Sequence, residues 1–154
     1  MKKSFATVAV LASLATTAFT ATAMADVPQA VKARQGQFNI MALNLGILGG
    51  MAKGQVEYDA EAAQAAADAL VAVSMINQAP MWPAGTDNMS IEGTRALPAM
   101  WDNVEDAMGN WAAFGEAAKA MQAAAGMGKD KIGPNMGKLG GSCKGCHDTY
   151  RAPK

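Results

Sequence analysis

The chain of 154 residues contains one histidine, two cysteines and few aromatic residues, which make up 6% of the total. It has no excess of either charge, because 13 basic residues balance 13 acidic ones. This balance excludes the basic footprint of a nucleic-acid-binding protein. No segment combines sustained strand-like alternation with β-branched residues, and no apolar run after residue 25 is long enough to cross a bilayer. These absences favour an all-α protein with no membrane span in the mature chain.

The N-terminus has the pattern of a secretory signal peptide. Lys2 and Lys3 precede an apolar run, and small residues follow up to Ala25. A membrane anchor is the competing interpretation, but the run is short for a span and is interrupted by serine and threonine. We therefore expect a signal peptide over residues 1–25, one domain over residues 26–154 and a periplasmic location. Without the two lysines, 11 basic residues remain against 13 acidic ones, a formal charge of −2.

Helical spacing of apolar residues divides the mature chain into four segments. The first helix carries a stripe of residues at steps of three and four, and the second runs from about Asp59 to Gln78. A loop follows from Pro80 to Leu97, whose apolar residues need an apolar environment. The third helix is expected to begin near Pro98 and the fourth to cover about Lys129 to Arg151. The first stripe comprises Val31, Arg34, Phe38, Met41, Leu45 and Leu48; the third comprises Leu97, Trp101, Val104, Met108, Trp111 and Ala118; the loop's apolar residues are Trp82, Met89 and Ile91. The pattern predicts an antiparallel four-helix bundle.

The fourth segment contains the one motif with specific chemistry, the C-x-x-C-H run of Cys143, Cys146 and His147. In this arrangement two thiols attach a haem covalently and the histidine ligates its iron. A thioredoxin-like redox pair would lie near a βαβ pattern, which is not seen. A structural disulfide would leave His147 unexplained, and a zinc site would need a carboxylate as its fourth ligand. The motif therefore predicts haem c on the C-terminal helix, with His147 as the metal ligand.

His147 is the only histidine, so two histidine ligands from one chain are impossible. The sixth ligand of the iron is then a methionine, a less usual group, or none. Twelve methionines keep the first option open, although most methionines on these stripes are expected to fill the core.

A haem motif in the last of four helices resembles the cytochrome c′ family. The resemblance rests on Arg34–Phe38 in the first helix, residues 83–86 and 94–101 around the central loop, and Cys143–Arg151 at the end. It implies that Arg34 meets a haem propionate and that Gln35 adds a polar contact at the haem edge. It also implies that Thr94, Trp101 and Arg151 lie at the haem pocket, with Arg151 near the proximal face.

Phe38 occupies the position at which six-coordinate relatives such as cytochrome c-556 carry a ligating methionine. A phenyl ring cannot ligate iron, so the resemblance implies a five-coordinate, high-spin haem covered by Phe38. Such a protein would transfer electrons or bind nitric oxide and carbon monoxide. The alternative is a six-coordinate electron carrier with a methionine ligand, for which Met41 is the main candidate. An enzyme such as a peroxidase is not expected, since the only histidine is proximal. The resemblance also implies a homodimer formed through the first two helices; the sequence does not identify a redox partner.

Overall fold

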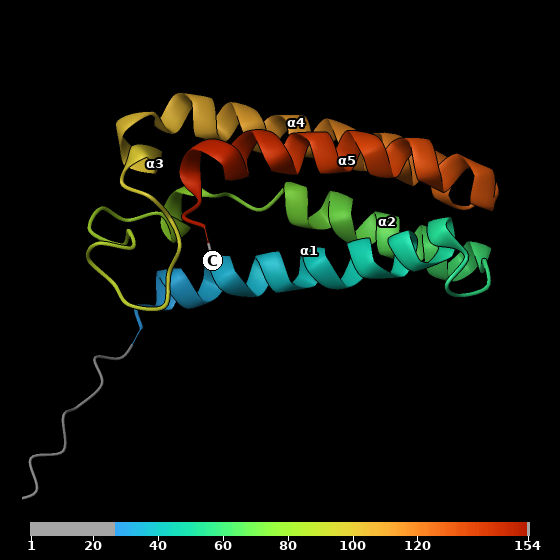
Figure 1. Cartoon of the computed structure of the whole chain (residues 1–154), viewed down its shortest axis with the longest axis horizontal. Coiled ribbons are helices and arrows are strands. Elements are labelled where there is room, and N and C mark those ends of the chain that lie inside the picture. Colours follow the sequence, from blue (N-terminus) through green and yellow to red (C-terminus); the bar gives the residue numbers. More distant parts are fainter. Residues whose placement is uncertain (1–26, 154) are drawn as a thin grey trace, which may run out of the picture.

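The computed structural model describes residues 27–153, so the signal peptide predicted over residues 1–25 lies outside the described residues. The helices are α1 (Gln29–Lys53), α2 (Ala60–Ser74), α3 (Ala99–Asp102), α4 (Val104–Ala125) and α5 (Lys129–Tyr150), with a short 3-10 helix, η1 (Ala79–Met81). The four long helices form an antiparallel bundle in which α1 contacts α2 and α5, while α4 contacts α2 and α5 (Figure 1). The predicted all-α four-helix fold is confirmed.

Local signals explain where the first two helices begin and end. Pro28 precedes α1, and its carbonyl accepts from the amide of Val31. α1 continues through the Gly49–Gly50 pair and ends at Gly54, whose φ of 70° is left-handed and favours glycine. Asp59 caps α2 by accepting from the amide of Ala62 at 2.8 Å.

Side chains from all four long helices meet in one core. Its largest fully buried apolar residues include Leu48 of α1, Leu70 of α2, Met121 of α4 and Leu139 of α5. Burial of each such side chain contributes about 2 kcal/mol. The first predicted stripe is buried at Val31, Arg34, Met41 and Leu48 but not at Phe38, which is 38% exposed. The core is therefore left open near Phe38.

The predicted third helix is interrupted and forms two helices, α3 and α4, so part of its predicted apolar stripe is wrong. α3 ends at Asp102. The next residue, Asn103, has a φ of −142° and a ψ of 58°, which are not helical, and α4 starts at Val104. The break shifts the helical register, so Val104 is 49% exposed while Ala107 and Phe114 are buried.

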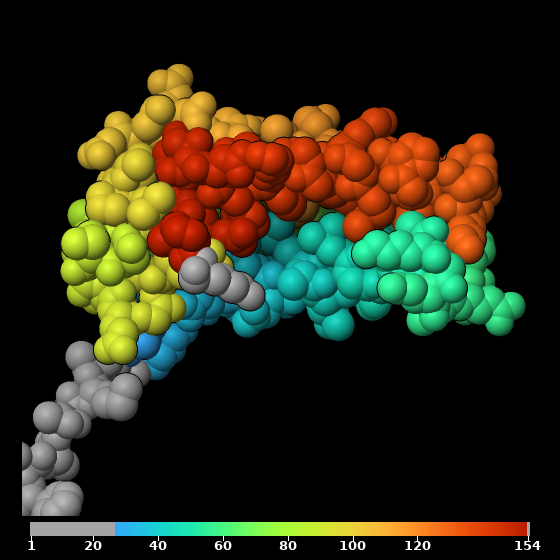
Figure 2. Space-filling model, in the orientation of Figure 1, coloured from blue at the N-terminus to red at the C-terminus, as the bar shows by residue number. Residues whose placement is uncertain are grey.

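The loop between α2 and α3 covers one end of the bundle, at the left of Figure 2. Met81 and Thr86 of this segment are buried, whereas Met89 is 81% exposed. The prediction that Met89 needs an apolar environment is therefore wrong. The chain end returns to the same loop, since the amide of Leu97 donates to Tyr150 O and the amide of Ala152 donates to Arg95 O. Among residues 27–153, no helix is both long and apolar enough to span a membrane.

Candidate functional site

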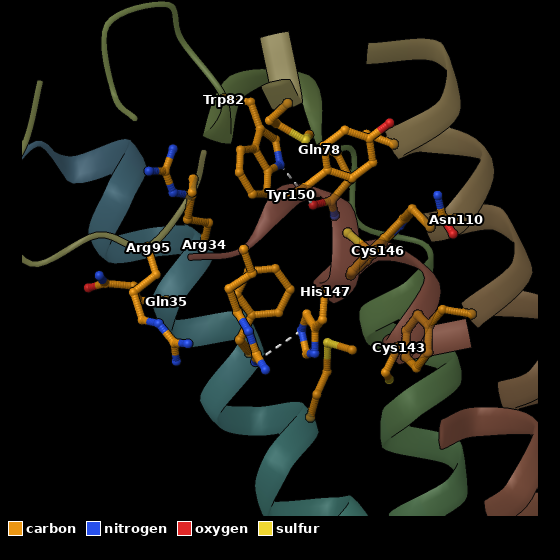
Figure 3. Close-up of a pocket in the computed structure, with 18 of the residues that line it drawn as sticks. Arg34, Gln35, Gln78, Trp82, Arg95, Asn110, Cys143, Cys146, His147 and Tyr150 are labelled. Carbon is orange, nitrogen blue, oxygen red and sulfur yellow. Dashed lines mark hydrogen bonds between the residues drawn. The ribbon is translucent and has the colours of Figure 1, made fainter. Parts of the chain in front are cut away.

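A cavity of about 470 Å³ opens between α1, α4, α5 and the α2–α3 loop (Figure 3). Its volume is within the usual range for small-molecule and cofactor sites, about 300–1,000 Å³. All three residues of the haem motif line it, as do Arg34, Gln35, Phe38, Thr94 and Arg151. Eight of the nine predicted site residues are thus brought together, and only Trp101 is absent from the lining.

The two cysteines of α5 lie on the side of the helix that faces this cavity (Figure 3). Both are half-buried free thiols. Burial raises the pKa of Cys143 and of Cys146 above the ordinary value, which keeps both sulfur atoms protonated. Because neither cysteine is in a disulfide, both thiols are available for the two thioether bonds that attach a haem through a C-x-x-C-H motif.

His147 extends into the same cavity one residue further along α5. Burial lowers its pKa, and the nearby positive charges of Arg151 and Arg95 lower it further, against the opposing effect of Asp148. The imidazole is therefore kept neutral, the form that ligates metals. Its Nε2 lies 3.2 Å from Nη1 of Arg151, so in this arrangement Nε2 carries the lone pair.

The opposite wall is formed by α1, from which Phe38 presents its ring. The ring packs edge-on against Trp82 and Trp111, with centroids 6.4 Å away in each case. Met41, one turn further along α1, also lines the cavity but is 7% exposed and belongs to the main core. Phe38 therefore presents only carbon atoms to the cavity, whereas the Met41 side chain is packed among core residues.

Arg34 is buried with 2% exposure, and its guanidinium holds the α2–α3 loop against α1. Nη1 donates to Thr86 Oγ1 at 2.8 Å and to Met81 O at 3.4 Å. Nη2 donates to Thr94 Oγ1 at 2.8 Å and to Thr86 O. The guanidinium carbon lies 4.7 Å from the ring centroid of Trp82. Burial lowers the pKa of Arg34, and Asp87 opposes this shift. Its predicted contact with a propionate remains a prediction; the structure assigns its terminal nitrogens to the loop.

The remaining predicted residues have distinct surroundings. The Gln35 amide donates to Gly93 O at 2.8 Å, and the Thr94 hydroxyl accepts from Arg34. Trp101 packs behind Trp82, with ring centroids 6.0 Å apart and its indole Nε1 donating to Trp82 O. Among residues 27–153, Trp101 therefore supports a wall of the cavity and does not line it.

Tyr150, Asn110 and Arg95 also line the cavity, although the sequence did not predict a site role for them. The Tyr150 hydroxyl donates to Asp106 Oδ2 at 2.6 Å, and this contact raises the pKa of Tyr150 to about 12. Asn110 donates to the same carboxylate from the same helix. Arg95 lines the cavity from the loop. Tyr150 lies on the cysteine-bearing face by helical spacing, but no periodic signal marks Arg95 or Asn110.

Comparisons with known proteins are consistent across sequence and structure. A sequence model described as Cytochrome C' matches residues 29–151. A cytochrome c' from Cereibacter sphaeroides is 38% identical over 130 residues, which cover 84% of this chain and 87% of that protein. A solved cytochrome c' named as from Rhodobacter spheriodes has a TM-score of 0.80 at 38% identity, covering 84% of this chain and all of that one. A nitric oxide complex of a cytochrome c prime variant from Alcaligenes xylosoxidans has a TM-score of 0.69 at 34% identity, covering 80% of this chain and 94% of that one.

The chain belongs to the cytochrome c′ family. Its cofactor is accordingly haem c, and the residues of the cavity fit that group. In Figure 3 the two cysteines lie on one side of His147, whereas Arg95 and Gln35 lie on the other. A haem carries its vinyl groups and its propionates on different edges, so it requires thiols at one end of a cavity and cationic or polar donors at the other. This cytochrome c′ chain supplies both.

Proposed function

We propose that this chain is a periplasmic haem c protein whose iron is five-coordinate, binds small neutral diatomic molecules such as nitric oxide and carbon monoxide, and exchanges electrons. When bound, the haem supplies an iron centre that changes oxidation state and accepts axial ligands. Cys143 and Cys146 would hold it through thioether bonds, and His147 would supply the protein ligand. Two observations support this role: all three side chains line one cavity, and burial lowers the pKa of His147, which favours the neutral imidazole that ligates metals.

The observation that carries the proposal is that Phe38 of α1 lines the same cavity as His147 of α5. Its ring offers no lone pair to a metal, and its edge contacts with Trp82 and Trp111 restrict where it can move. An apolar cover of this kind disfavours water and anions, because they would lose hydrogen bonds on entry. It admits neutral diatomic molecules, which lose little hydration. The nitric oxide complex of the Alcaligenes xylosoxidans relative is consistent with this use.

Met41 is the observation that favours a second candidate function, a six-coordinate electron carrier. It lines the same cavity from the same helix as Phe38. A thioether ligand there would stabilise reduced iron and prevent gas binding. We favour the five-coordinate form because Met41 is already buried in the main core, so ligation would require its side chain to leave that packing.

The proposal does not include enzymatic catalysis. A peroxidase needs a positioned distal acid or base, and the only histidine of the chain is the proposed proximal ligand. The periplasmic location rests on the signal-peptide pattern of residues 1–25. A homodimer through α1 and α2 is supported by exposed apolar side chains on α1 and just beyond the end of α2, namely Leu43 at 66% and Ile76 at 43%.

Carbon monoxide association kinetics test the role of Phe38. We expect Phe38→Ala in the ferrous holoprotein to raise the association rate constant at least about tenfold, which corresponds to about 1.4 kcal/mol of the barrier. Ile40→Ala is the matched control, because Ile40 is an exposed residue of the same helix that does not line the cavity, and its loss should leave the rate unchanged. Equal rate constants for Phe38→Ala and the wild type would show that Phe38 does not cover the binding face.

A further inference from the structure

Three arginines line the cavity, and they differ in how many of their N–H groups are already used. Arg34 is the most committed, since both terminal nitrogens donate to the α2–α3 loop through four hydrogen bonds. Its guanidinium also packs over Trp82. A second acceptor for those nitrogens would have to displace loop contacts. Arg34 is therefore a poor source of donors for an additional carboxylate.

Arg95 is held differently, because both of its hydrogen bonds go to one atom, the carbonyl oxygen of Ala152. Nε donates at 2.9 Å and Nη2 donates to the same oxygen. Within residues 27–153, the hydrogen bonds of the Arg95 side chain are made by Nε and Nη2, so Nη1 has no acceptor. The side chain is half-buried at the cavity. Nε and Nη2 of the guanidinium are thus held by the Ala152 carbonyl, whereas Nη1 remains available to donate to a ligand.

The anchor is itself fixed by the backbone. The amide of Ala152 donates to Arg95 O at 2.8 Å, and an isolated antiparallel bridge pairs Ala96 with Arg151. Arg95 and Ala152 therefore bind each other through backbone and side chain together. This reciprocal contact sets the direction of the guanidinium before any ligand arrives, which reduces the entropy lost on binding.

The position of Arg95 matches the polar end of a haem. In Figure 3 Arg95 lies across His147 from Cys143 and Cys146. A carboxylate entering a largely apolar cavity needs a cationic partner, since burying an unpaired charge is costly.

We infer that Arg95, oriented by the carbonyl of Ala152, pairs with a propionate of the haem, and that Arg34 acts as the clamp of the loop. The inference depends on the part of the proposed function that places a covalent haem in this cavity, and not on whether the iron is five- or six-coordinate. A cation paired with the propionate lowers the electrostatic cost of burying the carboxylate. The same cation favours the reduced iron, which carries one positive charge fewer than the oxidised iron, so it raises the midpoint potential. Arg95 is accordingly a haem-binding residue whose charge raises the redox potential.

The test is the midpoint potential of the holoprotein, measured by spectroelectrochemistry for the wild type and for Arg95→Gln, Arg95→Lys and Arg34→Gln. Loss of the Arg95 charge should lower the midpoint potential by about 59 mV. For a one-electron couple, this shift corresponds to an increase of about tenfold in the ferric-to-ferrous ratio at a fixed applied potential. Arg95→Lys retains the charge and should restore most of the wild-type value. Lys138→Gln, which removes an exposed charge from α5, is the control and should leave the potential unchanged.

A separate readout distinguishes this role from a structural one. The melting temperature should fall by a similar amount in Arg95→Gln and Arg95→Lys, because both variants lose the two hydrogen bonds to the Ala152 carbonyl. The midpoint potential should fall only in Arg95→Gln, which loses the positive charge. A wild-type potential in Arg95→Gln would overturn the inference, and a lowered potential in Arg34→Gln alone would assign the propionate to Arg34. A chain that fails to bind haem covalently would instead give no redox signal in the wild type, so failure of the proposed function is recognised separately.

Discussion

The clamp formed by Arg34 predicts a large loss of stability when its guanidinium is removed. Arg34→Met keeps much of the side-chain volume but removes the donors to Met81, Thr86 and Thr94. Hydrogen bonds from a charged group contribute about 1.5–3 kcal/mol each, and they are not additive. The Thr86 hydroxyl keeps its own bond to Pro83 O, so part of the network survives.

The net effect follows from these opposing contributions. Burial of the guanidinium is itself costly, and the more apolar Met side chain regains some of that free energy. We expect the free energy of unfolding to fall by about 3 kcal/mol, since the carbonyls of Thr86 and Met81 are left without this donor. For a chain of this size the melting temperature should fall by about 10 °C.

The assay is thermal unfolding of the holoprotein at pH 7, followed by far-ultraviolet circular dichroism. Lys119→Met is the matched control, because the Lys119 side chain is 59% exposed and its pair with Glu116 lies at the surface. The control should change stability by about 0.5 kcal/mol or less. An Arg34→Met variant as stable as the control would refute the clamp.

Two other predictions concern the cavity walls. Phe38→Met places a thioether where the phenyl ring now lies. The optical spectrum of the ferrous holoprotein should therefore change from high-spin to low-spin, and the protein should no longer bind carbon monoxide. An unchanged spectrum would show that a side chain at this position does not reach the iron. Tyr150 has a folded-state pKa of about 12, above its ordinary value of about 10, because its hydroxyl donates to Asp106. The contribution of this hydrogen bond to stability is complete below pH 10 and is lost as the pH rises through 12. The free energy of unfolding, measured by urea titration at several pH values in that interval, should therefore fall less in Tyr150→Phe than in the wild type.

The helices could be predicted from the sequence because their signals are local. Apolar spacing, Pro28, Asp59 and the glycine at 54 mark elements within a few residues of themselves. The break at Asn103 could not be predicted in the same way, since neither glycine nor proline stands there. One non-helical residue was enough to move Val104 to the surface and Ala107 into the interior.

The motif residues of the site were likewise local, whereas their surroundings depend on contacts between distant segments. Arg34 lies on a correctly predicted stripe, but its acceptors Thr86 and Thr94 are 52 and 60 residues away in the sequence. The link between Arg95 and Ala152 spans 57 residues. Helical periodicity carries no information about such pairs, so the loop's role at the cavity became apparent only from the folded chain.

The most direct test of the five-coordinate proposal is the optical spectrum of the purified ferrous holoprotein before and after addition of carbon monoxide. A cavity lined by Phe38 of α1 and His147 of α5 predicts a high-spin spectrum that shifts when carbon monoxide binds. A low-spin spectrum that does not respond to carbon monoxide would contradict it and would assign the sixth position to a methionine, with Met41 as the first residue to replace.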